Sequence, residues 1–252
     1  MSSKIIINAM DSEECRIAKI KDNKLEEFHT ESAGHEITQG NIYKGIITRI
    51  EPSLQAVFVD YGADKNGFLQ IQEIHSDYFH DSANGDRSIQ SLVRRGQELL
   101  VQVTKEPIMN KGAMLTTFLS LAGRYVVLMP GNDTRGISRK IDSEEERKRL
   151  KDILASVKIP EGFGVIIRTA GAECTKTLIN KDQTYLMRLW RTMRGNVMKV
   201  KAPELMYKER NLVLRSIRDY FTDDISEVLI DDPSVFMEVK DFMKIIAPKQ
   251  AK

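Results

Sequence analysis

Apolar and polar positions alternate in short runs through the first half of the chain. Residues 4–10, 15–20 and 24–31 show this pattern, and the turn Lys21-Asp22-Asn23 predicts a hairpin between the last two. Further strands, bounded by Gly, Asn or Pro, are predicted at residues 41–52, 54–62, 66–74, 97–107 and 113–123. The polar stretch 75–96 interrupts them as a long loop with room for one helical turn. Five short strands with one long interruption are typical of a small closed β-barrel of the oligonucleotide-binding type, the OB-fold.

After Gly123 the pattern becomes mixed, so the chain as a whole is predicted to be an α+β protein with several subdomains. The helix expected at 142–158 begins with Asp-Ser and three glutamates, which favour its positive N-terminal end. Asp232 followed by Pro233 is typical of an N-cap and the first helical residue. The expected strands are 124–131, 162–171 and 226–231, and the other helices are 181–200, 211–221 and 233–247.

Length and composition describe an ordinary globular protein of one large or two small domains. The chain has 252 residues, of which 41% are apolar and 29% charged. No window approaches the roughly 18 apolar residues of a membrane span, and the start is too quickly acidic for a secretory signal. Cys15 and Cys174 lie far apart and match no metal-binding spacing. Two buried, reduced thiols in a cytoplasmic protein are therefore expected.

The net charge of +2 conceals an uneven distribution. Residues 120–213 carry 19 Lys and Arg against 11 Asp and Glu, whereas residues 1–119 and 214–252 are both net acidic. The middle segment would therefore attract a polyanion. Charge alone does not distinguish RNA from DNA or from an acidic protein.

The residues themselves contain no catalytic constellation. The four histidines are scattered, and there is neither a serine nucleophile motif nor a Gly-rich phosphate loop. The carboxylate pair Asp223–Asp224 follows a predicted helix and is expected to be exposed, and the pair Asp231–Asp232 is expected to begin a helix. Neither pair is predicted to bind a metal, so the chain shows binding features only.

Two phenylalanines in the predicted barrel admit two interpretations. Phe58 and Phe68 either fill the barrel, which the pattern alone favours, or face outward and stack on unpaired bases. Nearby cations either follow a nucleic-acid backbone or, more simply, are solvated; they are Lys44, Arg49, Lys65 and Lys111.

The charged run of the helix at 142–158 is expected to be a solvated face, because its Glu-to-Lys and Glu-to-Arg pairs have helical spacing. Trp190 is expected in the core, since Leu186 and Met193 flank it at helical spacing. Three arginines cannot share its face and are expected to form a basic surface; they are Arg188, Arg191 and Arg194.

A buried strand ends on a polar pair. Val165, Ile166 and Ile167 lead directly to Arg168 and Thr169, and small residues follow. Arg168 is either an ordinary surface residue at a strand end or, with Thr169, a grip for a phosphate.

Several motifs resemble the bacterial ribonuclease E/G family of endoribonucleases, in order and along essentially the whole chain. They are "GNIYKGIITRIEPSLQAVFVDYGADKNGFLQIQEI", "NKGAMLTTFLSLAGRYVVLMPG", "RGISRKI", "PEGFGVIIRTAG" and "VLRSIRDYFTDDISEVLIDDP". The resemblance implies an OB-fold barrel of the ribosomal-protein S-one type at 37–119 and a 5′-sensor subdomain at 120–213. Residues 1–36 and 214–252 would form one split ribonuclease-H-like subdomain.

The resemblance also implies site residues. In the family, the positions of Arg168 and Thr169 bind the 5′-monophosphate of the RNA, and those of Gly123 and Val127 add main-chain contacts. The family's RNA-contacting barrel positions correspond to Phe58, Phe68 and Lys111, which favours the outward interpretation of the two phenylalanines.

These implications define the expected function. The chain is expected to be the RNA-binding N-terminal part of an enzyme that cleaves single-stranded RNA in ribosomal RNA processing and messenger RNA decay. The family's catalytic domain with its magnesium, and its zinc link, follow the segments matched here, so this chain alone is expected neither to cleave RNA nor to oligomerise. Two alternatives are a self-contained RNA-binding protein that recognises 5′-monophosphorylated ends and, with less support, a module that binds acidic proteins.

Overall fold

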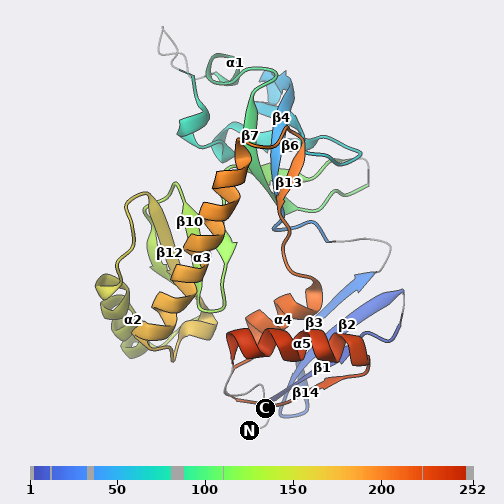
Figure 1. Ribbon diagram of the computed structural model, residues 1–252, viewed down its shortest axis with the longest axis vertical. Helices are drawn as coiled ribbons and strands as arrows, with labels where there is room; N and C mark the ends of the chain where they lie inside the picture. The colour runs from blue at the N-terminus through green and yellow to red at the C-terminus, as the bar shows by residue number, and fades with distance from the viewer. Residues whose placement is uncertain are drawn as a thin grey trace. The chain divides into compact units, whose positions relative to one another are not determined.

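The computed structural model describes residues 3–11, 13–32, 37–80, 88–109, 111–222 and 224–247. Part of the long loop 75–96 and Asp223 lie outside the described residues. The chain divides into two compact units, one formed by Met1–Ile37 with Arg210–Lys252 and the other by Thr38–Glu209. Figure 1 follows the chain through both units by colour, and each is described by itself below.

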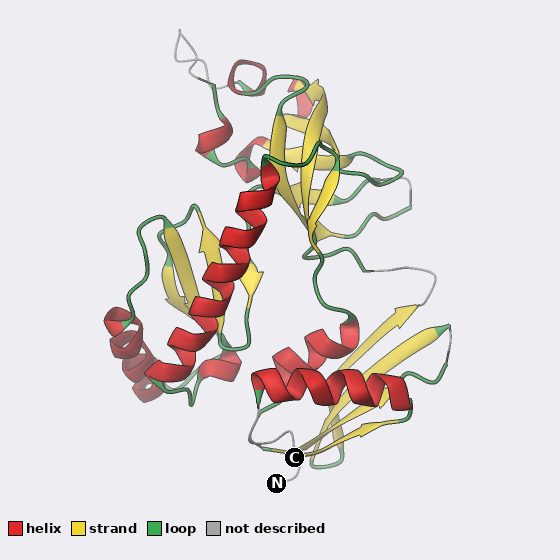
Figure 2. Ribbon diagram, in the orientation of Figure 1, coloured by secondary structure: helices red, strands yellow, loops and turns green. Residues whose placement is uncertain are grey.

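The first unit is a four-stranded sheet with two helices on one face (Figure 2). In the order of the sheet, its strands are β14 (Ile225–Ile230), β1 (Ser3–Asn8), β2 (Glu14–Lys21) and β3 (Lys24–Ser32). Its helices are α4 (Leu212–Tyr220) and α5 (Pro233–Ile246). The predicted hairpin β2–β3 is confirmed, and Asp22 and Asn23 turn it with φ of 48° and 61°. Ile5 and Ile7 alternate inward and pack against both helices.

The start of α5 agrees with its sequence signature. The Asp232 carboxylate accepts the N–H groups of Ser234 and Val235 at 2.8 and 2.9 Å, and Pro233 is the first helical residue. This confirms the predicted N-cap.

The second unit contains the predicted closed barrel of five strands. The order is β4-β5-β6-β8-β7, and β7 pairs again with β4 to close the barrel. The strands are β4 (Ile42–Glu51), β5 (Ala56–Asp60), β6 (Gly67–Gln70), β7 (Glu98–Lys105) and β8 (Met114–Thr116). The helical turn expected in the long loop is α1 (Ile89–Leu92), and 3₁₀ turns precede it.

The expected strand 113–123 is wrong as a single element. It is divided between β8 of the barrel and β9 (Leu121–Ala122), which belongs to the neighbouring sheet β11-β12-β10-β9. Thr117 donates its N–H to the Glu73 carbonyl, and Leu119 turns back onto Thr117, so the chain leaves the barrel here. The apolar pattern runs through this exit without a Gly or Pro and gives no sign of it.

The neighbouring sheet carries helices α2 (Glu144–Ser156) and α3 (Lys176–Val197). Its other strands are β10 (Val126–Pro130), β11 (Arg135–Ile137) and β12 (Phe163–Ile167). The sequence did not predict β11, nor β13 (Glu204–Tyr207), which pairs with β4 of the barrel. Helix α3 begins five residues earlier than expected, where Thr175 caps it.

One continuous apolar cluster joins the barrel to this sheet. Ile42 and Leu100 of the barrel belong to the same buried cluster as Leu128, Leu150 and Leu186. Trp190 is partly buried and packs against this cluster, in broad agreement with its predicted core position.

Lys44 also lies at this junction and is buried rather than solvated, which corrects the expectation from the sequence. Its Nζ donates to the Val200 carbonyl at 2.9 Å and lies 2.7 Å from the Glu98 carboxylate, whose pKa it lowers.

None of the helices in the part of the chain that the structure describes has the length and apolar character of a membrane-spanning helix.

The barrel core and the barrel surface should respond differently to truncation. Leu69 is fully buried, whereas its neighbour Phe68 is half-buried on the opposite face of β6. Leu69→Ala should lower the free energy of unfolding by about 2–5 kcal/mol, and Phe68→Ala by roughly 1 kcal/mol or less. Urea unfolding followed by fluorescence of Trp190, the single tryptophan, measures both. Equal losses would contradict the assignment of the two faces.

Candidate nucleic-acid interface

Phe58 and Phe68 lie side by side on the outer face of the barrel. Val57 and Val59 are fully buried, so the alternation along β5 turns Phe58 outward. Phe58 and Phe68 are register partners on β5 and β6, with ring centroids 5.7 Å apart and planes at 62°. The interpretation that they fill the barrel is therefore wrong, and the pair forms an aromatic surface.

Cations border this aromatic pair. Arg49, the partner of Phe58 on β4, places its guanidinium carbon 4.3 Å from the centroid of that ring. Lys111 is exposed and lies two residues before Ala113, whose carbonyl accepts the N–H of Phe68 at 2.8 Å. The structure thus brings Phe58, Phe68 and Lys111 to one rim of the barrel.

Close backbone packing and side-chain hydrogen bonds hold this rim. A Cβ on Gly112 would lie 1.9 Å from the Asn66 carbonyl oxygen, so the approach requires glycine. The Asn66 amide donates to the Thr48 hydroxyl at 2.8 Å, and that hydroxyl donates to the Phe58 carbonyl at 3.1 Å. The aromatic surface is therefore supported by Thr48 on β4, by Asn66 just before β6 and by Gly112 just before β8.

Arg168 and Thr169 lie at the end of β12. The Arg168 N–H donates to the Tyr125 carbonyl at 2.7 Å, and its Nη1 donates to the Gly123 carbonyl at 2.6 Å. Thr169 is exposed and begins a 3₁₀ turn, and its hydroxyl lies 3.0 Å from that of Ser138. A half-buried guanidinium and two hydroxyl groups therefore gather at this edge of the sheet.

Val127 lies on the adjacent strand β10. It pairs with Ile166 of β12 and Ala122 of β9, and its side chain is half-buried. Its main chain therefore lies beside the strand that leads to Arg168.

Asp182 of α3 holds the turn that precedes β10. Its carboxylate accepts the N–H groups of Arg124, Tyr125 and Val126 at 3.3, 2.8 and 3.0 Å. A Cβ on Gly123 would lie 2.4 Å from an oxygen of this carboxylate, so a side chain there would displace the carboxylate from the turn. Burial raises the pKa of Asp182, opposed by these three hydrogen bonds and by the charge of Arg168.

Two arginines of α2 support the loops on either side of Thr169. Arg147 donates to the carbonyls of Ser138 and Ile141 at 2.9 and 3.0 Å. Arg149 donates to the Cys174 carbonyl at 3.2 Å and also to that of Ala172. The expectation that this charged run is simply a solvated face is therefore wrong for Arg147, which is half-buried. Arg149 is exposed as expected, although its guanidinium also donates to main-chain carbonyls. Other cations of this part of the chain are exposed, namely Arg135, Arg139, Lys140, Arg188, Arg191 and Arg194.

The described carboxylates do not form a metal site. No group of three or more potential His, Cys, Asp or Glu ligands occurs in the part of the chain that the structure describes. Asp224 accepts the Ser3 hydroxyl at 2.7 Å, and Asp231 accepts the Ala9 N–H at the same distance. The described residues therefore do not fit a magnesium or zinc centre.

The two cysteines differ in burial. Cys174 is buried and Cys15 is only half-buried, and neither forms a disulfide.

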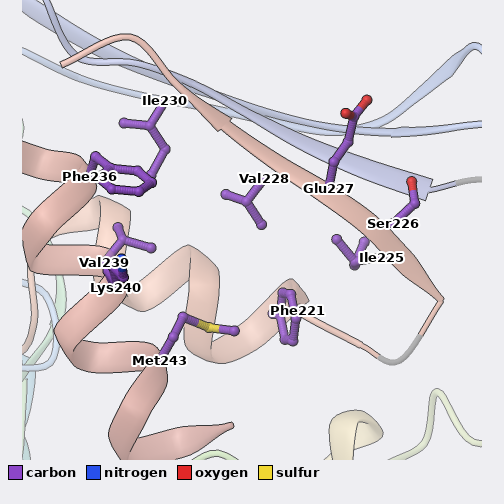
Figure 3. Close-up of a pocket in the computed structure, with 10 residues that line it drawn as sticks. All are labelled: Phe221, Ile225, Ser226, Glu227, Val228, Ile230, Phe236, Val239, Lys240 and Met243. Atoms are coloured by element: carbon purple, nitrogen blue, oxygen red, sulfur yellow. The ribbon is translucent and has the colours of Figure 1, made fainter. Parts of the chain in front are cut away.

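A groove of about 470 Å³ in the first unit lies between β14 and α5 (Figure 3). Its walls are mainly apolar, with Val228 and Ile230 on the strand side and Phe236, Val239 and Met243 on the helix side. Ser226, Glu227 and Lys240 also line it, and none of the predicted site residues does.

Sequence reasoning identified the residues exposed at these two surfaces but not those that hold them. Arg147, Arg149 and Asp182 carry no sequence signal of these roles, because each binds main-chain groups that are not its neighbours in the sequence.

Known proteins and family models match almost the whole chain. The model described as "Ribonuclease E/G family" matches residues 120–252, and "S1 RNA binding domain" matches residues 36–115. The chain is 46% identical to ribonuclease E of Escherichia coli over 92% of its own length and 22% of that protein. It is 44% identical to ribonuclease E of Haemophilus influenzae over 97% of its length and 26% of that protein. With ribonuclease G of E. coli it shares 35% identity over 99% of its length and 52% of that protein. The chain thus spans about a quarter of the ribonuclease E relatives.

The raised pKa of Asp182 predicts a pH dependence of stability. A carboxyl whose pKa is higher in the folded state binds its proton more tightly there, so its contribution to stability falls as the pH rises through that pKa. The advantage of the unmutated chain over Asp182→Asn should therefore shrink as the pH rises from the ordinary range of an aspartate carboxyl through the raised pKa of Asp182. Urea unfolding followed through Trp190, which is also on α3, measures the difference. An advantage that grows with pH would contradict the prediction.

Proposed function

The chain belongs to the ribonuclease E/G family and carries an S1 RNA-binding domain, and from this premise we propose that it is the part of an endoribonuclease that recognises RNA. In this proposal the barrel binds a single strand, and the edge of the sheet at Arg168 binds the 5′-monophosphate. The enzyme acts in ribosomal RNA processing and messenger RNA decay. Cleavage, with the magnesium and zinc that the family resemblance implies, belongs to other parts of a longer protein.

The arrangement around Arg168 is the observation that carries the assignment of the phosphate site. A guanidinium is a planar fork with five N–H donors, so it can be anchored by one carbonyl and bind a phosphate through another edge. The Gly123 carbonyl is such an anchor, and the hydroxyls of Thr169 and Ser138 add neutral donors beside it. Hydrogen bonds from Arg147 and to Asp182 fix the surrounding loops before any ligand arrives. A fixed receptor of this size complements one terminal phosphate.

The barrel rim suits an unpaired strand. Phe58 and Phe68 offer ring surfaces on which bases stack whatever their identity, and Arg49 and Lys111 attract the phosphates between them. A duplex hides its base faces, so such a surface favours single-stranded RNA.

We predict a preference among RNA 5′ ends. A monophosphate should bind more tightly than a hydroxyl, which leaves Arg168 without its ligand, and more tightly than a triphosphate, whose extra bulk and charge the receptor does not match. Arg168→Lys should lose much of the preference, because an ammonium lacks the planar fork. Thr169→Val should lose less, since one hydrogen bond to a charged group contributes roughly 1.5–3 kcal/mol at most.

The measurement is a titration of one short RNA with each of the three ends at fixed salt. Arg188→Lys, a matched change at an exposed arginine of α3, should leave the preference unchanged. Equal affinity for all three ends would refute the sensor assignment, and a preference that survives Arg168→Lys would show that the fork does not read the phosphate.

We predict that the barrel phenylalanines contribute to affinity but not to folding. Phe58→Ala or Phe68→Ala should weaken binding of single-stranded RNA by about 1–3 kcal/mol, the usual contribution of one base stacked on an aromatic ring. Phe28→Ala, at an exposed phenylalanine of β3 in the first unit, serves as the control. Filter binding or fluorescence anisotropy measures affinity, and thermal melting checks the fold. Loss of the cooperative melting transition in either barrel variant would contradict an exterior role.

A further inference from the structure

The turn between β7 and β8 presents two large apolar side chains to solvent. Ile108 is 64% exposed and Met109 is 92% exposed. The two side chains are adjacent in sequence and have lysines beside them, and an apolar patch rimmed by polar residues is a feature of interaction sites.

Hydrogen bonds support the described residues of this turn. The Lys111 N–H donates to the Ile108 carbonyl at 2.9 Å, and the Lys65 ammonium donates to the Met109 carbonyl at 2.7 Å. Met109 itself has φ of +50°, in the left-handed region that a side chain with a Cβ disfavours. The turn therefore keeps an exposed methionine in a position that backbone preference alone would give to glycine or asparagine.

The turn projects from the same rim as the aromatic surface. Immediately after it, Gly112 packs against the Asn66 carbonyl, and Ala113 accepts the N–H of Phe68. Phe68 and Met114 then pair as parallel neighbours. Ile108 and Met109 are thus attached, through a few residues of closely packed backbone, to the edge that carries Phe68.

We infer that Ile108 and Met109 form an apolar contact for one further unpaired RNA base, next to those that stack on Phe58 and Phe68. The inference rests on the proposed RNA binding of the barrel. A thioether is polarisable and packs well against an aromatic ring such as a nucleobase. Lys65 and Lys111 flank the pair, so the charge around it suits a strand whose backbone is negative. An RNA base therefore fits this patch better than an apolar protein surface, for which the two lysines would be unfavourable.

The test is binding of a short oligouridine with a 5′-hydroxyl, which removes any contribution of a terminal phosphate. Met109→Ala should raise the Kd about three- to tenfold, and Ile108→Ala combined with it should raise the Kd further. Because the lost contact is apolar, the dependence of log Kd on log salt concentration should keep its slope. Lys111→Ala should instead reduce that slope by about one.

Two variants serve as controls. Met109→Leu, which keeps the apolar area, should retain most of the affinity. Met198→Ala removes an equally exposed methionine, 90% accessible at the end of α3, and should have no effect. Thermal melting should be unchanged for all of these surface variants.

The outcomes separate this inference from the proposed function. If Phe58→Ala weakens binding and the double variant of Ile108 and Met109 does not, the inference is wrong and the barrel assignment remains. If neither weakens binding, or the unmutated chain does not bind the oligouridine, both are wrong. A reduced salt slope in Met109→Ala would also overturn the apolar contact.

Discussion

The geometry of the sheet edge at Arg168, the proposed phosphate site, depends on the hydrogen bonds that the Asp182 carboxylate accepts from three successive N–H groups of the turn before β10. That turn includes Gly123, whose carbonyl orients the Arg168 guanidinium. A helix residue therefore controls the direction of a side chain on a strand through main-chain atoms alone. Burial makes the ionised Asp182 carboxylate costly. The three main-chain hydrogen bonds and the positive charge of Arg168 both offset that cost.

The barrel surface depends on a different constraint, the two-residue period of β-strands. Val57 and Val59 point into the barrel, so Phe58 must point outward, and the antiparallel register then places Phe68 beside it. Gly112 lets the turn that carries Lys111 approach this edge more closely than any side chain would allow. The pairing of the barrel strands thus brings the aromatic surface, Lys111 and the apolar turn at Ile108 and Met109 to one rim.

The cations of the chain divide into those that build the site and those available to a ligand. Lys44, Arg147 and Arg149 all donate to main-chain carbonyls and hold segments together. In the linear sequence they are indistinguishable from exposed cations such as Arg139 and Arg188. The excess positive charge of residues 120–213 therefore includes arginines, such as Arg147 and Arg149, whose guanidinium groups also hold main-chain segments together.

From the sequence alone, local pattern determined most of the elements: the hairpin, the barrel strands, the N-cap at Asp232 and the strand that ends at Arg168. These depend on periodicity and on neighbouring residues, which a sequence displays directly. Motif resemblance supplied the family. Only the tertiary structure decided that Phe58 and Phe68 face outward as a pair, that residues 113–123 divide between two sheets, and that Asp182 and Arg147 support the site. The pairing of the two phenylalanines depends on the register between strands, which the sequence of one strand does not give. The division of 113–123 and the support of the site depend on which main-chain groups meet, and hydrogen bonds to peptide groups leave no signature in residue type.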